Sequence, residues 1–189
     1  LWSAWFRARH YAARLDTDFD AAAWQVEHAA LVRKTAARYE AEGYVVMVEH
    51  QNTFTLAGKL GTLAGRPDIV AVRGDEGWII DCKTGQPKAA DSAQLRLYLW
   101  ALPLAHPAYA GVKFRGRVQY KCQYALISPT EAGADFVGQA ADLLRVICGP
   151  EPPRKAPSYK ECQFCPLTPD DCGDRVDSEV AYAGVTEEF

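Results

Sequence analysis

Two apolar segments joined by a short Gly-Asp turn constrain the fold of this chain more than any other feature. The segments are residues 69–72 and 78–80, and the turn between them contains Gly74 and Asp75. A two-residue loop of this composition favours an antiparallel β-hairpin. With Gly74 and Asp75 as the loop, Asp68 lies directly across from Asp81.

The two ends of this hairpin carry a distinctive set of charged side chains. Because side chains alternate along a strand, Asp81 and Lys83 share one face and Cys82 points to the other. Opposed Cβ atoms lie about 4.5–5.5 Å apart, so Asp68 and Asp81 can hold one cation between them. Carboxylates with a lysine and no paired histidine suit Mg²⁺ or Mn²⁺ better than Zn²⁺. The alternative is a solvated turn, and a slip of one residue would place the two acids on opposite faces.

The remaining pattern indicates an α/β (α+β) fold around a mixed sheet. Asp20 is expected to cap the second of two N-terminal helices, and Gly43 to end it. Asp91 is expected to cap a helix that Pro103 ends. The expected helices cover residues 2–15, 21–42, 92–102 and 135–147, and the expected strands cover residues 44–56, 62–72, 78–84 and 112–127.

Three motifs follow one another in order over residues 65–98. They are Gly65-Arg66-Pro67-Asp68, Asp81-Cys82-Lys83-Thr84, and Gln94 with Tyr98. This order resembles the PD-(D/E)XK nuclease superfamily, in particular its RecB-like branch with G-x-x-D, D-x-K-T and Q-x-x-x-Y. The resemblance covers roughly residues 20–128. It implies a restriction-endonuclease-like core, with a central mixed β-sheet flanked by helices and a C-terminal Cys-rich segment.

The resemblance also implies roles for these motif residues. Asp68 and Asp81 would bind Mg²⁺ or Mn²⁺, and Lys83 would position or activate the attacking water. Gln94 and Tyr98 are one helical turn apart, so they project from one face, where they would contact the DNA backbone. Their alternatives are a capping-box role for Gln94 with the preceding N-cap, and a core position for Tyr98.

A third metal ligand is implied on the helix before the sheet. The RecB-like branch uses a histidine there, and His28 is the candidate. An exposed helical histidine without a ligand role is the alternative. Glu49, expected on the first strand, is a weaker substitute because strand glutamates are usually solvated.

Three cysteines near the C-terminus have metal-ligand spacing. Cys162, Cys165 and Cys172 form a C-x2-C-x6-C pattern, for which Zn²⁺ and a [4Fe–4S] cluster are both chemically possible. Each normally needs a fourth ligand. We expect a structural centre without redox catalysis.

The resemblance favours the iron–sulfur cluster over zinc. CRISPR spacer-acquisition exonucleases and AddB-type nuclease domains join a C-terminal cysteine trio to an N-terminal cysteine around [4Fe–4S]. This chain has no cysteine before Cys82. Cys148, His10 or a cysteine upstream of Leu1 are the alternatives for the fourth ligand. Cys82 and Cys122 are expected to be core residues.

A basic strand face is the candidate for DNA contacts outside the active site. Between residues 112 and 122, basic and amide side chains alternate with apolar ones, and no acid occurs from 112 to 130. One face would therefore meet phosphates, although a plain solvated face is the alternative. The basic residues are Lys113, Arg115, Arg117 and Lys121.

Composition limits the class of protein. A net charge of −3 at pH 7 excludes a strongly basic nucleic-acid binder and predicts weak, salt-sensitive intrinsic DNA affinity. No apolar run is long enough to span a membrane and no signal peptide is visible, so we expect a cytoplasmic protein. Residues 1–189 are expected to form a single nuclease domain. Its parts are an N-terminal helix (1–19), a nuclease core (20–148), a Pro-rich linker (149–157), the Cys cluster (158–175) and an acidic tail (176–189).

These observations lead to one expected function and two alternatives. The expectation is a divalent-metal-dependent DNA exonuclease, a phosphodiester hydrolase that acts on single-stranded DNA or DNA ends. It would serve CRISPR adaptation, recombination and repair, or antiviral defence against phage, within a larger protein assembly. The first alternative is a catalytically dormant DNA- or partner-binding subunit. The second is a zinc-stabilised adaptor.

Overall fold

A computed structural model describes residues 1–10, 20–59 and 61–178, and it divides the chain into two compact units. One unit comprises residues 19–141, and the other comprises residues 1–18 together with 142–189. Residues 11–15 of the expected first helix and residues 179–189 of the acidic tail lie outside the described residues. Each unit is described by itself below.

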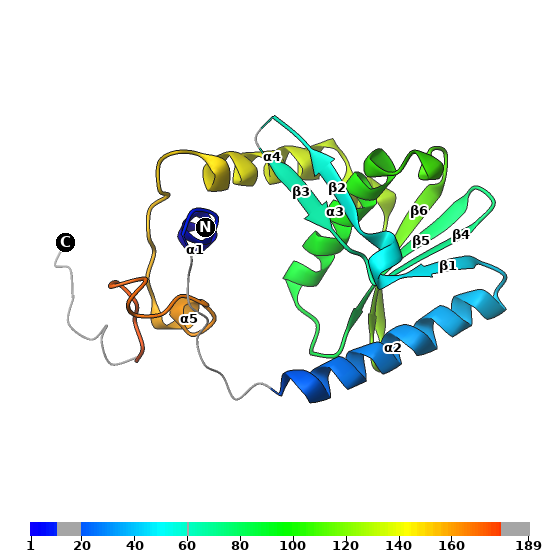
Figure 1. The fold of residues 1–189 in the computed structure, drawn as a ribbon, viewed down its shortest axis with the longest axis horizontal. Coiled ribbons are helices and arrows are strands. Elements are labelled where there is room, and N and C mark those ends of the chain that lie inside the picture. The colour runs from blue at the N-terminus through cyan, green and yellow to red at the C-terminus, as the bar shows by residue number, and fades with distance from the viewer. Residues whose placement is uncertain (11–19, 60, 179–189) are drawn as a thin grey trace. The chain divides into compact units, whose positions relative to one another are not determined.

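The unit of residues 19–141 is built on a five-stranded mixed sheet with the strand order β1-β4-β5-β6-β7. Only β5 and β6 run parallel, and α3 connects them (Figure 1). The mixed sheet flanked by helices confirms the expected fold class. The strands are β1 (Val45–Val48), β4 (Ile69–Arg73), β5 (Glu76–Lys83), β6 (Lys113–Tyr120) and β7 (Tyr124–Ile127).

The β4–β5 hairpin has the predicted register. Val70 pairs with Ile79, Arg73 pairs with Glu76, and Gly74 adopts a φ of 62° in the two-residue turn. Glycine reaches this left-handed region without steric cost, which explains its place in the loop.

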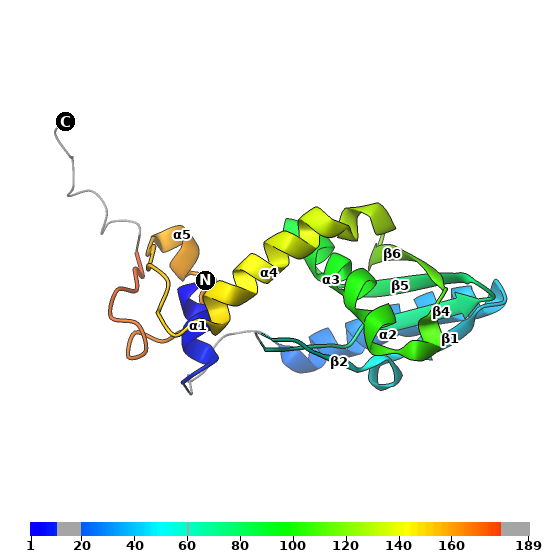
Figure 2. The ribbon, with the colours of Figure 1, turned by 90° about the horizontal axis from the view of Figure 1, so that it is seen from above.

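Two helices cover the two faces of the sheet. Helix α2 (Ala21–Ala41) packs on the face that carries Ile69, Ile80 and Cys82, and α3 (Ala89–Ala105) packs on the face that carries Val70 and Ile79 (Figures 1 and 2). Alternation along β5 therefore sends Cys82 towards α2, and Asp81 and Lys83 towards α3, as predicted.

The capping residues predicted for α2 are confirmed, whereas those predicted for α3 are wrong. Asp20 caps α2 by accepting a hydrogen bond from the Ala23 amide at 2.9 Å, and Gly43 follows with a φ of 83°. Helix α3 begins earlier than expected, at Ala89, and continues to Ala105, so the prediction that Pro103 ends it is wrong. The Asp91 carboxylate lies inside its first turn and accepts from the Lys88 amide at 3.0 Å. The capping role suggested for Gln94 is therefore wrong.

Three expected strands are each divided in the structure. The stretch expected over 44–56 contains β1, a 3₁₀ turn (Glu49–Asn52) and then β2 (Phe54–Ala57). Strand β2 pairs with β3 (Thr62–Gly65) in a separate hairpin beside α3 (Figure 1). Phe54 of β2 packs against Tyr98 of α3. The stretch expected over 62–72 contains β3 and β4, which belong to different sheets and are separated by residues 66–68. The stretch expected over 112–127 contains β6, a turn and β7, which pair antiparallel. Cys122 lies exposed in that turn, so the prediction that it is a core residue is wrong.

The unit of residues 1–18 and 142–189 joins the N-terminal helix to the C-terminal segments. Within it, the indole nitrogen of Trp5 on α1 (Trp2–Arg7) donates to the carbonyl of Gly149 at 2.9 Å. The ammonium of Lys155 lies 4.3 Å from the centroid of the Trp2 ring and 2.7 Å from Asp174 Oδ2. Helix α4 (Ala134–Cys148) contains the boundary between the units, and α5 (Tyr159–Cys162) is a single turn capped by Ser158.

Candidate active site

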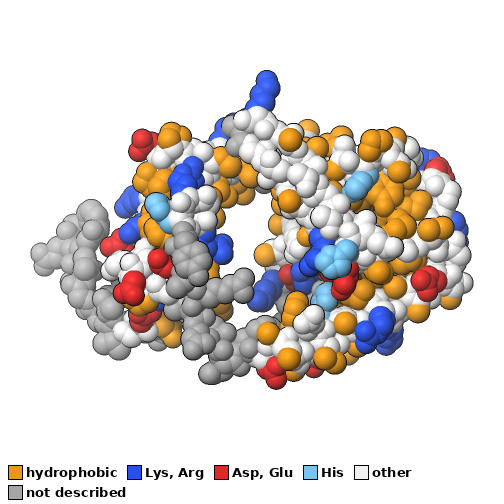
Figure 3. Space-filling model, in the orientation of Figure 1, with side chains coloured by type: hydrophobic (Ala, Val, Ile, Leu, Met, Phe, Trp, Pro, Cys, Tyr) orange, Lys and Arg blue, Asp and Glu red, His pale blue; other side chains and the backbone are white. Residues whose placement is uncertain are grey.

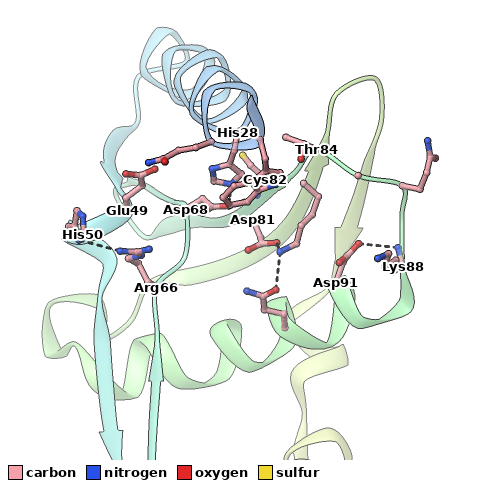
Figure 4. A pocket seen from close by; sticks show the side chains of 16 residues that line it. His28, Glu49, His50, Arg66, Asp68, Asp81, Cys82, Thr84, Lys88 and Asp91 are labelled. Carbon is pink, nitrogen blue, oxygen red and sulfur yellow. Dashed lines mark hydrogen bonds and ion pairs between the residues drawn. The ribbon is translucent and has the colours of Figure 1, made fainter. Parts of the chain in front are cut away.

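A pocket of about 490 Å³ opens at the end of the sheet where β5 leaves the core. Its lining comes from α2, the Glu49–Asn52 turn, the segment before β4, the end of β5 and the start of α3 (Figure 4). In the space-filling view, histidine, acidic and basic side chains gather together on this face of the unit (Figure 3). The lining residues that the sequence singled out are His28, Glu49, Asp68, Asp81, Lys83 and Gln94.

Asp81 is the most buried charged residue of this pocket, and it forms an ion pair with Lys83. Asp81 is 2% exposed, and its Oδ2 lies 2.7 Å from the ammonium nitrogen of Lys83. Burial raises the pKa of Asp81 to about 6, against the opposing effect of Lys83. Burial is the largest single effect on Lys83 and disfavours its charge, but the carboxylates of Asp81, Asp68 and Asp91 together outweigh burial and raise the pKa of Lys83.

Asp68 is held between the backbone of β5 and a histidine of α2. Its Oδ2 accepts a hydrogen bond from the Cys82 amide at 2.6 Å and lies 3.4 Å from Nε2 of His28. The His28 ring stacks on Trp24, one helical turn earlier, with a centroid separation of 5.2 Å. The three predicted metal ligands His28, Asp68 and Asp81 therefore line one pocket, although they come from α2, the segment before β4, and β5.

Gln94 and Tyr98 extend the Lys83 contact along α3. The Lys83 ammonium donates to Oε1 of Gln94 at 3.0 Å, and Nε2 of Gln94 donates to the Tyr98 hydroxyl at 2.8 Å. Lysine can only donate, so this pair of contacts determines which way the Gln94 amide faces. The Tyr98 ring packs edge-on against Phe54 at 5.9 Å and is not part of the pocket lining.

The sequence did not indicate the residues that hold the backbone around Asp68 in place by hydrogen bonds. Asn52 is 1% exposed, and its side-chain nitrogen donates to the carbonyls of Met47 and Pro67 at 3.0 and 3.1 Å. The Glu49 amide donates to the Asp68 carbonyl at 2.8 Å. Glu49 lies in the 3₁₀ turn with a φ of 45°, so its expected place on a strand is wrong. No local pattern marked Asn52, because its partners are backbone carbonyls and one of them, that of Pro67, is 15 residues away in sequence.

A match to a known family supports these geometric observations. A family model of the PD-(D/E)XK nuclease superfamily matches residues 1–169. The chain belongs to this superfamily. The match extends over the three motifs and over Cys162 and Cys165. It does not single out the RecB-like branch, which stays a prediction.

Other comparisons add little to this assignment. The crystal structure of SSO0001 is similar, with 20% identity and a TM-score of 0.43. The match covers 75% of this chain and 64% of that one, so the chain spans less than two thirds of that protein's solved length. No curated protein matches the sequence.

Members of the PD-(D/E)XK superfamily typically use Mg²⁺ or Mn²⁺, and the carboxylate oxygens in this pocket suit such an ion. Oδ2 of Asp81 is buried and has no well-directed hydrogen bond to any described residue, despite the nearby Lys83 ammonium. Carboxylate oxygens are the preferred ligands of hard divalent cations. Across residues 1–10, 20–59 and 61–178, however, no three His, Cys, Asp or Glu side chains are already arranged around a common point as a metal site.

The cysteine trio lines a different pocket, within the other unit. Cys162 is buried, Cys165 and Cys172 are partly exposed, and the pocket has a volume of about 480 Å³. The Cys165 amide donates to the Cys162 carbonyl at 3.0 Å, which closes the turn of the C-x2-C motif. Cys148 is exposed at the end of α4 and is not among the residues that line this pocket. His10 packs against Phe6 with a centroid separation of 4.6 Å.

The four basic residues of the predicted DNA-binding face have different surroundings. Lys113 and Lys121 form ion pairs with Asp75 and Glu27 at 2.7 and 2.6 Å. The guanidinium of Arg115 lies over the ring of Trp78. Arg117 is 6% exposed, so it does not contribute to an open basic surface. Among the described residues, no helix is both long enough and apolar enough to cross a membrane.

Proposed function

We propose that this protein is a divalent-metal-dependent deoxyribonuclease that hydrolyses phosphodiester bonds, acting as an exonuclease on single-stranded DNA or DNA ends. One observation carries the proposal: Asp68, Asp81 and Lys83 line one pocket in a chain of the PD-(D/E)XK superfamily. A bound Mg²⁺ or Mn²⁺ would supply the Lewis acid that polarises the phosphate and lowers the pKa of water.

The residues of the chain supply binding, orientation and proton control. Asp68 and Asp81 would hold the ion, with His28 as a third ligand. Lys83 would orient the attacking water or a phosphate oxygen from the same side of the sheet. Gln94 contacts the Lys83 ammonium at 3.0 Å and so restricts its position, and Tyr98 restricts Gln94 in turn.

The test is cleavage of a 5′- or 3′-labelled single-stranded oligonucleotide with Mn²⁺ and without it. The wild-type protein should shorten the strand only with metal, and the label that is lost first gives the polarity. Asp81→Ala and Lys83→Ala should each reduce the rate by at least about 100-fold. Unchanged cleavage by either purified, folded variant would remove its assignment. DNA binding without any cleavage by the wild-type protein would favour the dormant subunit instead.

For the cysteine segment, we propose a structural [4Fe–4S] cluster with Cys162, Cys165 and Cys172 as ligands, and Zn²⁺ as the alternative. The shared pocket of the three side chains supports this assignment. Anaerobically purified protein should show a broad absorption band near about 400 nm if iron–sulfur is correct. Stoichiometric zinc without that band would assign zinc.

The biological setting is part of the proposal. A net charge of −3 implies limited unaided DNA affinity, so delivery of the substrate by a larger cytoplasmic assembly is consistent with the sequence. CRISPR adaptation, recombination and repair, and antiviral defence are the settings that the RecB-like resemblance suggests. Copurification of a stable partner from the native host would support this view, and a monomer with full activity would oppose it.

A further inference from the structure

A second pocket, of about 260 Å³, lies between α2 and the β6–β7 hairpin. Its lining is rich in basic side chains and contains no carboxylate among the described residues. Arg117 lines this pocket although only 6% of its surface is exposed. The basic lining residues are Lys34, Arg38, Arg117 and Lys121.

Two of these four cations are already neutralised. Arg38 pairs with Glu42 at 3.1 Å, and Lys121 pairs with Glu27 at 2.6 Å. Within the described part of the chain, neither Lys34 nor Arg117 has a carboxylate within ion-pair distance. The pocket therefore combines an exposed lysine with a buried guanidinium, and both lack a counter-charge.

The neighbours of Arg117 orient it without supplying the missing charge. Its Nε donates to Oε1 of Gln119 at 2.8 Å, and its guanidinium carbon lies 3.9 Å from the centroid of the Tyr124 ring. Tyr39 is also near Arg117, but burial, as the largest effect, raises the pKa of Tyr39, so its hydroxyl stays neutral at pH 7. Removing an unpaired guanidinium from water is costly, and a cation–π contact offsets only a part of that cost.

We infer that this pocket binds a phosphate group, with Arg117 as its base and Lys34 at its rim. The planar fork of an arginine matches two oxygens of a phosphate, and the anion would provide the charge that the site lacks. Inorganic phosphate and a DNA strand share this chemistry. The location favours DNA as the physiological source.

Both pockets take lining residues from α2, so they are neighbours along this helix. His28 lines the active-site pocket, while Lys34 lines the phosphate pocket. At about 1.5 Å and about 100° per residue, these positions are about 9 Å apart along the helix axis and about 120° apart around it. About two or three phosphates of one strand would span this separation. The assignment of DNA as the source rests on the proposed nuclease function, but the existence of the phosphate site does not.

Thermal unfolding tests the pocket without DNA. Sodium phosphate should raise the Tm of the wild-type protein by about 2–4 °C relative to sodium chloride at equal ionic strength. Arg117→Gln should unfold at the same or a higher temperature in chloride, because it removes an unpaired buried charge, and should lose the phosphate-specific increase. An equal increase in both proteins would overturn the site. A large decrease in the Tm of Arg117→Gln in chloride would identify Arg117 as a structural residue and would also overturn it.

A matched pair on the exposed surface of α2 tests the DNA source. Lys34→Gln and Arg33→Gln each remove one exposed positive charge, but Arg33 does not line this pocket. Without added divalent cations, Lys34→Gln should weaken single-stranded DNA binding about threefold to tenfold and reduce the salt slope by about 0.7, whereas Arg33→Gln should not. Equal effects of the two variants would overturn DNA as the source. Metal-dependent cleavage by the wild-type protein separately tests the nuclease function, so the two failures are distinguishable.

Discussion

The Cys82 amide donates a hydrogen bond to Oδ2 of Asp68 at 2.6 Å. This hydrogen bond fixes Asp68, a candidate metal ligand, to β5 at the residue between Asp81 and Lys83. Cys82 contributes through its backbone, while its thiol is buried on the α2 side and burial raises its pKa to about 12. The middle residue of the D-x-K motif therefore packs into the core and also positions Asp68.

The buried Asn52 should be important for Asp68 although it does not touch the proposed metal. Asn52→Ala leaves the carbonyls of Met47 and Pro67 without their donor, so the free energy of unfolding should decrease by about 2–3 kcal/mol. The Mn²⁺ concentration that gives half-maximal cleavage should also increase. Urea unfolding and a Mn²⁺ titration measure the two effects. Thr53→Ala is the control, since Thr53 is exposed and directly follows the same turn, and this substitution should cost less than about 1 kcal/mol.

Removing the Tyr98 hydroxyl should lower activity without unfolding the protein. Tyr98→Phe keeps the ring contact with Phe54 but removes the acceptor of Gln94 Nε2. The Gln94 amide then holds the Lys83 ammonium less firmly, so kcat should decrease about threefold to tenfold while the free energy of unfolding changes by less than about 1 kcal/mol. Steady-state kinetics and urea unfolding test this. An unchanged kcat would show that the Lys83–Gln94–Tyr98 contacts do not control the rate.

The raised pKa of Asp81 predicts how the stability of the metal-free protein depends on pH. The folded-state pKa of about 6 lies above the ordinary value of 3.8, so the folded state binds a proton more tightly than the unfolded state does. The free energy of unfolding should therefore fall as pH rises from about 4 to 7, by at most about 3 kcal/mol from this residue.

Asp81→Asn isolates this contribution, because the asparagine does not titrate. As pH rises over the same range, the free energy of unfolding of the wild type should decrease relative to that of the variant. Chemical denaturation at pH 4.5 and 7.5 without divalent cations measures it. A constant difference would mean that Asp81 has an ordinary pKa.

The cysteine segment predicts unequal effects of two serine substitutions. Cys165 lines the pocket of the trio, whereas Cys148 is exposed and does not line it. Cys165→Ser should therefore lose most of the bound iron or zinc, while Cys148→Ser should keep it. Elemental analysis with the absorption spectrum near about 400 nm measures both. Metal loss from Cys148→Ser would instead identify Cys148 as the fourth ligand.

Local patterns in the sequence were sufficient to predict the hairpin and its functional face. Turn composition and strand alternation act over a few residues, so the Gly74-Asp75 loop predicted the pairing of Val70 with Ile79 and the common face of Asp81 and Lys83. The cap at Asp20 was predictable for the same reason. The single strand expected over 112–127 was wrong because its basic and apolar alternation continues into the β6–β7 turn.

Side-chain environments that depend on distant segments required the folded structure. Asn52 supports Asp68 only because the Glu49–Asn52 turn packs against the segment before β4. Arg117 was expected on an open basic face, but α2 and Tyr124 cover it and convert an exposed charge into a buried one without a counter-charge. Alternation and turn chemistry are encoded by neighbouring residues, whereas burial and charge balance arise from packing between elements far apart in the chain. The motif chemistry was therefore readable from the amino acids, and the support of Asp68 and the phosphate pocket emerged only from the fold.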